Sequence, residues 1–172
     1  MLDKPAAARV EALWLELEAE CGLVGAKAAP FPHFSWQVAE NYHLPRLETM
    51  LRKITRRTQP FMLRTAGLGL FTGENPIVYV SLVKDESLLR FHAMLWEQTK
   101  KIAIHPLPHY ALEHWVPHIT LAYGDVRRDN LGCALQTLAF QSFDWEIWVD
   151  NVVFIAQADN QTTETRRYRF GE

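Results

Sequence analysis

The sequence lacks a long hydrophobic run, a cysteine framework and an excess of charge of either sign. No apolar stretch reaches the ~20 residues that a membrane-spanning helix requires, so we expect no membrane partner. The 18 basic and 20 acidic residues leave a formal net charge of −2, whereas domains that bind long nucleic acid over their surface are usually strongly basic. The composition therefore disfavours such a domain and permits a small anionic ligand or a local basic patch.

Cysteine is scarce, and its two copies, Cys21 and Cys133, do not form a CxxC pair. Two isolated cysteines are not the framework of a small secreted disulfide-rich domain, so we expect both to be reduced residues in or near the core. The first 20 residues are acidic and amphipathic, which is not typical of a signal peptide. These features together favour a cytoplasmic location.

The pattern of apolar residues predicts a mixture of helices and strands in a chain of 172 residues, of which 48% are hydrophobic. Apolar positions at helical spacing predict helices, and short alternating runs bounded by proline or glycine predict strands. Helices are expected at residues 3–21, 45–57, 86–102 and 127–140. Strands are expected at residues 33–39, 61–71, 76–83 and 116–124, and two or three more within 143–158 and 163–170. Residues 104–114 are interrupted by proline and are expected to be irregular.

The order of these elements repeats, because strand, helix and hairpin occur in the first half and again in the second. This repetition predicts an α+β fold with two pseudo-symmetric lobes of mainly antiparallel sheet, outer helices and a central cleft. Residues 1–172 are expected to form a single bilobal domain, in which residues 1–22 add an N-terminal helix.

Two short motifs, "PHFS" and "PHIT", begin equivalent predicted strands. Residues two apart on a strand share a face, so His33 and Ser35 point one way, as do His118 and Thr120. If the two strands meet, their imidazoles can divide proton transfer at a phosphodiester, one acting as base and the other as acid. The hydroxyl groups of Ser35 and Thr120 can then bind the non-bridging phosphate oxygens. This chemistry requires no metal and no cofactor.

The two motifs, whose histidines lie 85 positions apart, resemble the paired H-x-[S/T] signature of the 2H phosphoesterases, which include 2′-5′ RNA ligase-like proteins and cyclic phosphodiesterases. Residues 67–82 also look like the central hairpin of that family, and the resemblance covers roughly residues 30–170. It implies that His33 and His118 form an acid–base pair acting on 2′,3′-cyclic phosphate or 2′-5′ linkages of RNA or nucleotides, with 2′-5′ ligation as the reverse reaction.

Other candidate contacts to the substrate follow from residue type. Many relatives carry arginine where this chain has Tyr123, and a tyrosine there could stack on a base or donate a hydrogen bond. Trp36 and Phe71 are candidate stacking residues, with core packing as the alternative for each. The guanidinium of Arg64 could reach a phosphate. The expected substrate is a nucleotide or RNA end with a cyclic phosphate, and the expected protein is a monomer.

Three other interpretations remain open at this point. The spacing of four histidines suggests zinc, but prolines interrupt the segment and no cysteine lies near it, so a metal site is disfavoured; these histidines are His105, His109, His114 and His118. The same fold could serve as a non-catalytic RNA- or nucleotide-binding module. The N-terminal helix could instead dock a partner through Trp14 and Leu17.

Overall fold

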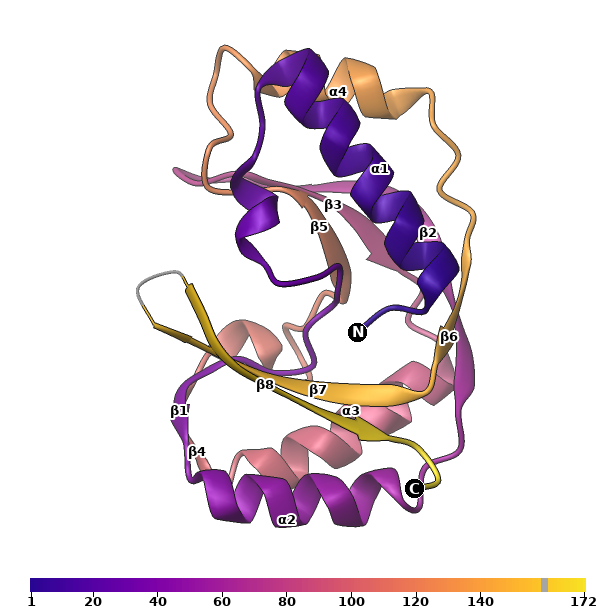
Figure 1. The fold of residues 1–172 in the computed structure, drawn as a ribbon, viewed down its shortest axis with the longest axis vertical. Coiled ribbons are helices and arrows are strands. Elements are labelled where there is room, and N and C mark those ends of the chain that lie inside the picture. The colour runs from indigo at the N-terminus through magenta and orange to yellow at the C-terminus, as the bar shows by residue number, and fades with distance from the viewer. Residues whose placement is uncertain (159–160) are drawn as a thin grey trace.

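A computed structural model describes residues 1–158 and 161–172 of the chain, and Figure 1 shows its fold. Within these residues the helices are α1 (Lys4–Cys21), α2 (Leu44–Thr55), α3 (Glu86–Thr99) and α4 (Leu131–Ala139), with 3-10 turns η1 (Gly25–Ala28) and η2 (Pro108–Tyr110). The strands are β1 (Ala39–Tyr42), β2 (Phe61–Phe71), β3 (Ile77–Leu82), β4 (Ala103–Pro106), β5 (His118–Ala122), β6 (Glu146–Val149), β7 (Asn151–Ala158) and β8 (Gln161–Arg169).

The largest sheet has four strands in the order β5-β3-β2-β6, and all of its pairs are antiparallel. β2 changes partner along its length, because Phe61–Arg64 pair with β6 and the later residues pair with β3. The register shifts between Thr65 and Leu68, where Gly67 has φ +89°, a conformation that favours glycine. This bulge bends β2, so the sheet curls instead of lying flat (Figure 1).

Helix α1 covers the edge strand of this sheet. Its N-terminus is capped by Asp3, whose carboxylate accepts the Ala6 N–H, and it ends at Gly22 in the left-handed conformation. Its apolar face is buried, and the indole of Trp14 on that face donates to the backbone carbonyl of Thr120 on β5 over 3.1 Å. The helix expected at residues 3–21 is therefore confirmed, and it supports the strand of the second histidine motif.

Helix α4 lies beside α1. The β7–β8 hairpin crosses the middle of the view in Figure 1, with α2 and α3 below it and strands β3 and β5 above it. β1 and β4 form a short antiparallel pair of their own. The α+β class with antiparallel sheets is confirmed, while the pseudo-symmetry of two lobes and the single-domain organisation stay predictions.

The strand expected at residues 33–39 is shorter than predicted. Within residues 33–38, only Phe34 makes a β-bridge, an isolated antiparallel one to Ile119, and the chain bends at Trp36 before β1 begins at Ala39. Proline at position 32 removes one backbone donor, which limits ladder formation on this segment.

Two other local expectations also differ from the structure. Residues 104–114 were expected to be irregular, yet Ala103–Pro106 form β4, because β1 supplies a partner that lies far away in sequence. The last helix was expected to be capped near Asp129; it begins at Leu131 after Asn130, whose side chain accepts the Arg127 N–H and closes a turn before the helix.

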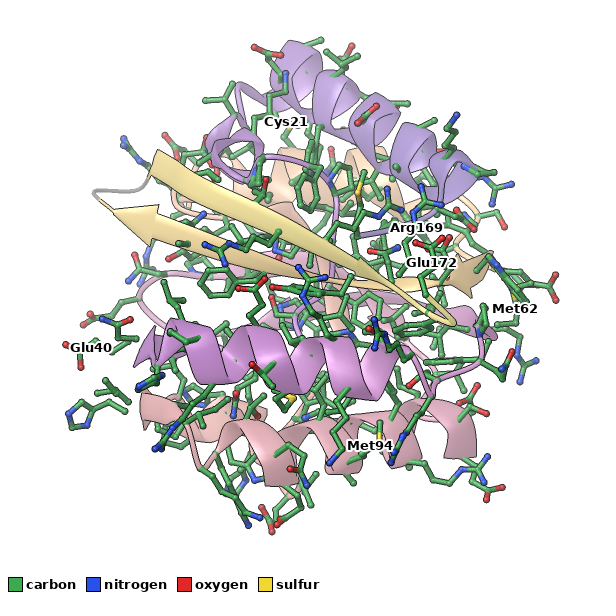
Figure 2. All side chains as sticks on the ribbon, turned by 60° about the horizontal axis from the view of Figure 1, so that its bottom comes forward. Cys21, Glu40, Met62, Met94, Arg169 and Glu172 are labelled. Atoms are coloured by element: carbon green, nitrogen blue, oxygen red, sulfur yellow. A yellow bond between two sulfur atoms is a disulfide. The ribbon has the colours of Figure 1, made fainter. Side chains whose placement is uncertain are left out.

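The expectation of reduced cysteines is wrong. Cys21, labelled in Figure 2, lies at the C-terminal end of α1 and forms a disulfide with Cys133 of α4. The two Cα atoms are 5.8 Å apart although 112 positions separate them in sequence, because α1 and α4 pack side by side. The expected cytoplasmic location was inferred in part from reduced cysteines. Without that argument it stays a prediction.

Candidate active site

His118 and Thr120 lie on β5, at the edge of the four-stranded sheet. The alternation expected of a strand is present, because Ile119 and Leu121 are 0% and 1% exposed whereas His118 and Thr120 are half-buried on the opposite face. The sequence prediction of one shared face for the imidazole and the hydroxyl therefore agrees with the structure.

The first motif lies along the outer edge of β5. Because Phe34 is bridged to Ile119 in the antiparallel sense, His33 lies across from Thr120, and Ser35 lies across from His118. Phe34 and Ile119 are both buried, so the alternation of an extended chain directs the four polar side chains away from them. The bridge thus sets two motifs that are 85 positions apart in sequence side by side.

Both histidines are held by the same kind of hydrogen bond. The Nδ1 of His33 lies 2.9 Å from the carbonyl of Phe31, and the Nδ1 of His118 lies 2.7 Å from the carbonyl of Val116. A carbonyl oxygen can only accept, so each Nδ1 carries a proton and donates it. In the neutral ring the lone pair is therefore on Nε2, for which the part of the chain that the structure describes shows no hydrogen-bond partner.

Burial lowers the pKa of both histidines below the ordinary value. For His33 the loss of hydration dominates, the bond to Phe31 opposes it, and nearby positive charge, including that of His118, lowers the pKa further. For His118 burial likewise dominates, opposed by the bond to Val116. A positive charge on His118 thus disfavours the protonation of His33.

An aromatic pair flanks His118. The ring of Phe71, from the end of β2, meets the imidazole edge-on at 4.9 Å, and the ring of Tyr79 on β3 lies 5.1 Å away. Phe71, predicted as a possible stacking residue, is thus beside the second histidine. Sequence reasoning missed Tyr79, although its place in the hairpin beside Phe71 was a usable signal. Gly69 leaves room for this ring, because a Cβ there would lie 2.3 Å from it.

Trp36 supports the first motif from the core. Its side chain is 8% exposed and stacks on Trp115 at 5.6 Å, and the indole of Trp115 donates to the backbone carbonyl of Ser35 over 3.1 Å. The buried ring of His92 stacks on Trp115 in turn, at 3.7 Å. Trp36 also lines a cavity beside the first motif, and its predicted role as a stacking residue stays a prediction.

Arg64 and Tyr123 lie towards the surface. Arg64 is exposed in the half of β2 that pairs with β6, directly across from Glu146, and Phe71 is at the other end of that strand. Tyr123 is 50% exposed just after β5. Their predicted contacts with substrate therefore depend on a ligand that extends beyond the histidine pair, and they stay predictions.

A cavity of about 210 Å³ opens beside the first motif. His33 and Ser35 contribute to its wall, together with Gln37 and Tyr42 from the segment that follows and with residues of β7. Sequence reasoning missed Gln37 and Tyr42. The polar residues at every second position, His33, Ser35 and Gln37, were a signal that could have identified Gln37.

The histidines of the zinc hypothesis are dispersed. His105, His109 and His114 are exposed, and no group of three or more potential metal-ligating His, Cys, Asp or Glu side chains forms among residues 1–158 and 161–172. None of the helices described here combines the length and the apolarity needed to cross a bilayer.

Comparison with known proteins identifies the class. The chain matches the 2′-5′ RNA ligase superfamily over residues 2–161, and it therefore belongs to this superfamily of 2H phosphoesterases. The resemblance found in the two motifs is thus confirmed. The match takes in α1, whereas the resemblance was expected to begin near residue 30.

A curated relative agrees with this class. The chain is 28% identical over 113 residues to a protein of Oceanobacillus iheyensis named "Putative phosphoesterase OB1230". The match covers 65% of this chain and 61% of that protein, so the chain spans about three fifths of the length of its relative.

Proposed function

We propose that the protein is a metal-independent phosphoesterase acting on 2′,3′-cyclic phosphate or 2′-5′ linkages of RNA or nucleotides. The observation that carries the proposal is the antiparallel bridge between Phe34 and Ile119, since it aligns the two histidine motifs, and neither Nε2 atom has a hydrogen-bond partner among the described residues. Membership of the superfamily supports the substrate class.

In the proposed hydrolysis, the neutral Nε2 of one histidine takes a proton from water as the water oxygen forms a bond to phosphorus. The bond from phosphorus to a ribose oxygen breaks, and the Nε2–H of the other histidine protonates the departing oxygen. The hydroxyls of Ser35 and Thr120 donate to the non-bridging oxygens, where negative charge increases. The reverse sequence, with a ribose hydroxyl in place of water, joins a 2′-5′ linkage.

The lowered pKa values favour the role of the base. Burial favours the neutral form of each ring, so a base is available at neutral pH, and the charge of His118 lowers the pKa of His33 further. The histidine that acts as acid must hold its proton against this effect of burial. Which histidine acts as base depends on the direction in which the substrate lies. The proposal also keeps a cleft between two pseudo-symmetric lobes, a monomeric protein and a cytoplasmic location.

The test is a product analysis with 2′,3′-cyclic nucleotides and 2′-5′ oligonucleotides, in the presence of EDTA. We expect hydrolysis of the cyclic phosphate to one phosphomonoester isomer, with a bell-shaped dependence of rate on pH. Activity that EDTA abolishes and zinc restores would contradict the metal-independent mechanism. Binding without turnover, unchanged in His33→Gln and His118→Gln, would favour the non-catalytic module instead.

A further inference from the structure

Within residues 1–158 and 161–172, the side-chain amide of Gln37 makes one hydrogen bond, although an amide can make more. Its Oε1 accepts a hydrogen bond from the hydroxyl of Tyr42 over 3.1 Å, which orients the amide. Its Nε2 is buried and has no acceptor among the residues that the structure describes. A buried donor without a partner is costly, so such a group at the wall of a cavity points to an acceptor supplied by a ligand.

The cavity that Gln37 lines has the size and the walls for a planar ring. An apolar cavity of about 150 Å³ holds benzene, so about 210 Å³ leaves room for a ring with polar substituents. Phe31, Tyr42 and Phe154 contribute aromatic rings to the wall, and those of Tyr42 and Phe154 are perpendicular at 6.2 Å. Aromatic walls with one directed donor suit a heterocycle that carries a carbonyl oxygen.

The cavity also lies at a suitable distance from the proposed phosphate site. Ser35 and Gln37 are two positions apart, so their backbones are separated by at most about 7 Å. The space between a phosphate bound at the two histidine motifs and the Gln37 amide would therefore hold about one sugar. His33 and Ser35 line the same cavity as Gln37, which makes the path continuous.

We propose that this cavity is a nucleobase subsite, in which the Nε2 group of Gln37 donates to a carbonyl oxygen of the base. The inference rests on the proposed function, and it assigns to Gln37 the discrimination between substrates with and without such a base. Tyr42 is a positioning residue, because it holds the Oε1 of Gln37 and so fixes the orientation of the amide.

The test compares two substrates that share a five-membered cyclic phosphate, uridine 2′,3′-cyclic monophosphate and glycerol 1,2-cyclic phosphate, of which only the first has a base. In Gln37→Met, we expect the ratio of kcat/KM for the uridine substrate to that for the glycerol substrate to fall about 3- to 10-fold, through KM, since one neutral hydrogen bond is lost. Gln98→Met, at an exposed position of α3, is the matched control and should leave the ratio unchanged.

Tyr42→Phe should lower the same ratio by a smaller factor, because Gln37 keeps its donor and loses its orientation. An unchanged ratio in Gln37→Met, with the fold verified by thermal melting, would overturn the subsite.

Binding of uridine 3′-monophosphate and of inorganic phosphate, measured by calorimetry, separates this inference from the proposed function. If the wild type hydrolyses neither cyclic substrate but Gln37→Met weakens binding of the uridine compound alone, the function fails and the subsite holds. If the wild type hydrolyses both substrates and Gln37→Met leaves the ratio and the binding unchanged, the function holds and the subsite fails.

Discussion

The two histidine motifs share the same local hydrogen bond and the same direction of pKa shift, but they are held in place by different parts of the fold. In each, a proline precedes the histidine, Nδ1 donates to the carbonyl two positions earlier, and burial lowers the pKa. His118, however, begins a strand paired with β3 and covered by α1, whereas His33 lies on a segment with a single β-bridge. The same local motif thus occurs in two contexts, only one of which is a regular strand.

The difference shows that the position of the first motif depends on side-chain packing. Phe34 and Trp36 are buried, and their rings meet edge-on at 4.7 Å. The indole N–H of the buried Trp115 donates a hydrogen bond to the carbonyl of Ser35. A ladder of backbone bonds holds His118 in place even when one side chain changes. His33 has no such ladder, so its alignment with His118 should be the more sensitive of the two to mutation.

The largest effect is expected from removing either imidazole. His33→Ala and His118→Ala should each lower kcat/KM for a 2′,3′-cyclic nucleotide by about 10³-fold, because one proton transfer loses its catalyst. The double variant should be little worse than either single one, because the pair acts as a unit. Steady-state kinetics on variants with unchanged thermal melting measure this. Retention of activity in one single variant would break the equivalence of the two motifs.

The next effect concerns the packing that holds the first motif. Phe34→Ala should lower the free energy of unfolding by about 3–5 kcal/mol, because it leaves a cavity in the core and removes the bridge residue's contacts. Denaturant unfolding measures the loss, with Phe140→Ala as control at a side chain that is 94% exposed. The control should change stability by no more than about 0.5 kcal/mol. Equal stability of both variants would show that Phe34 does not support the motif.

A smaller effect is expected from the two hydroxyls. Ser35→Ala and Thr120→Val should each reduce kcat by about 10²-fold, since each removes one donor to the charged transition state. Ser35 also interacts with the hydroxyl of Tyr110, where it lowers the pKa of Tyr110 against the larger, opposite effect of burial. Tyr110→Phe should therefore lower kcat less than Ser35→Ala does. Kinetics that leave Ser35→Ala at the wild-type rate would limit phosphate binding to the second motif.

The smallest effect is on stability in mild acid. Burial lowers the pKa of His92 to about 4, and the pKa values of His33 and His118 are lowered in the same direction. The unfolded chain therefore binds more protons than the folded one as pH falls below the ordinary histidine range, and folded stability is lost towards pH 4. The melting temperature at pH 5 should be a few degrees below that at pH 7, because each kcal/mol of lost folding stability lowers it by about 2–4 °C.

His92→Phe should narrow this difference between pH 5 and pH 7, because it removes the most strongly shifted of the three groups. A difference of the same size in His92→Phe and the wild type would assign the acid sensitivity to other residues.

Local patterns predicted much of the fold. Helix α1 follows from its cap, its apolar spacing and its terminal glycine, and the β2–β3 hairpin follows from two alternating runs around a turn. The pairing of β1 with β4 could not be predicted, because each has only four residues and their partner choice depends on packing. The disulfide likewise joins cysteines that no local signal connects.

The sequence by itself determined which residues could carry the chemistry. Alternation puts a histidine and a hydroxyl on one face, and this holds locally because successive side chains of an extended chain point to opposite sides. Only the tertiary structure decided that the two motifs lie antiparallel across one bridge, that Gln37 lines a cavity and finds no acceptor for its Nε2 among the described residues, and that Cys21 meets Cys133. These contacts join distant parts of the chain, so their free energy comes from burial in a shared core and leaves no periodic pattern in the sequence.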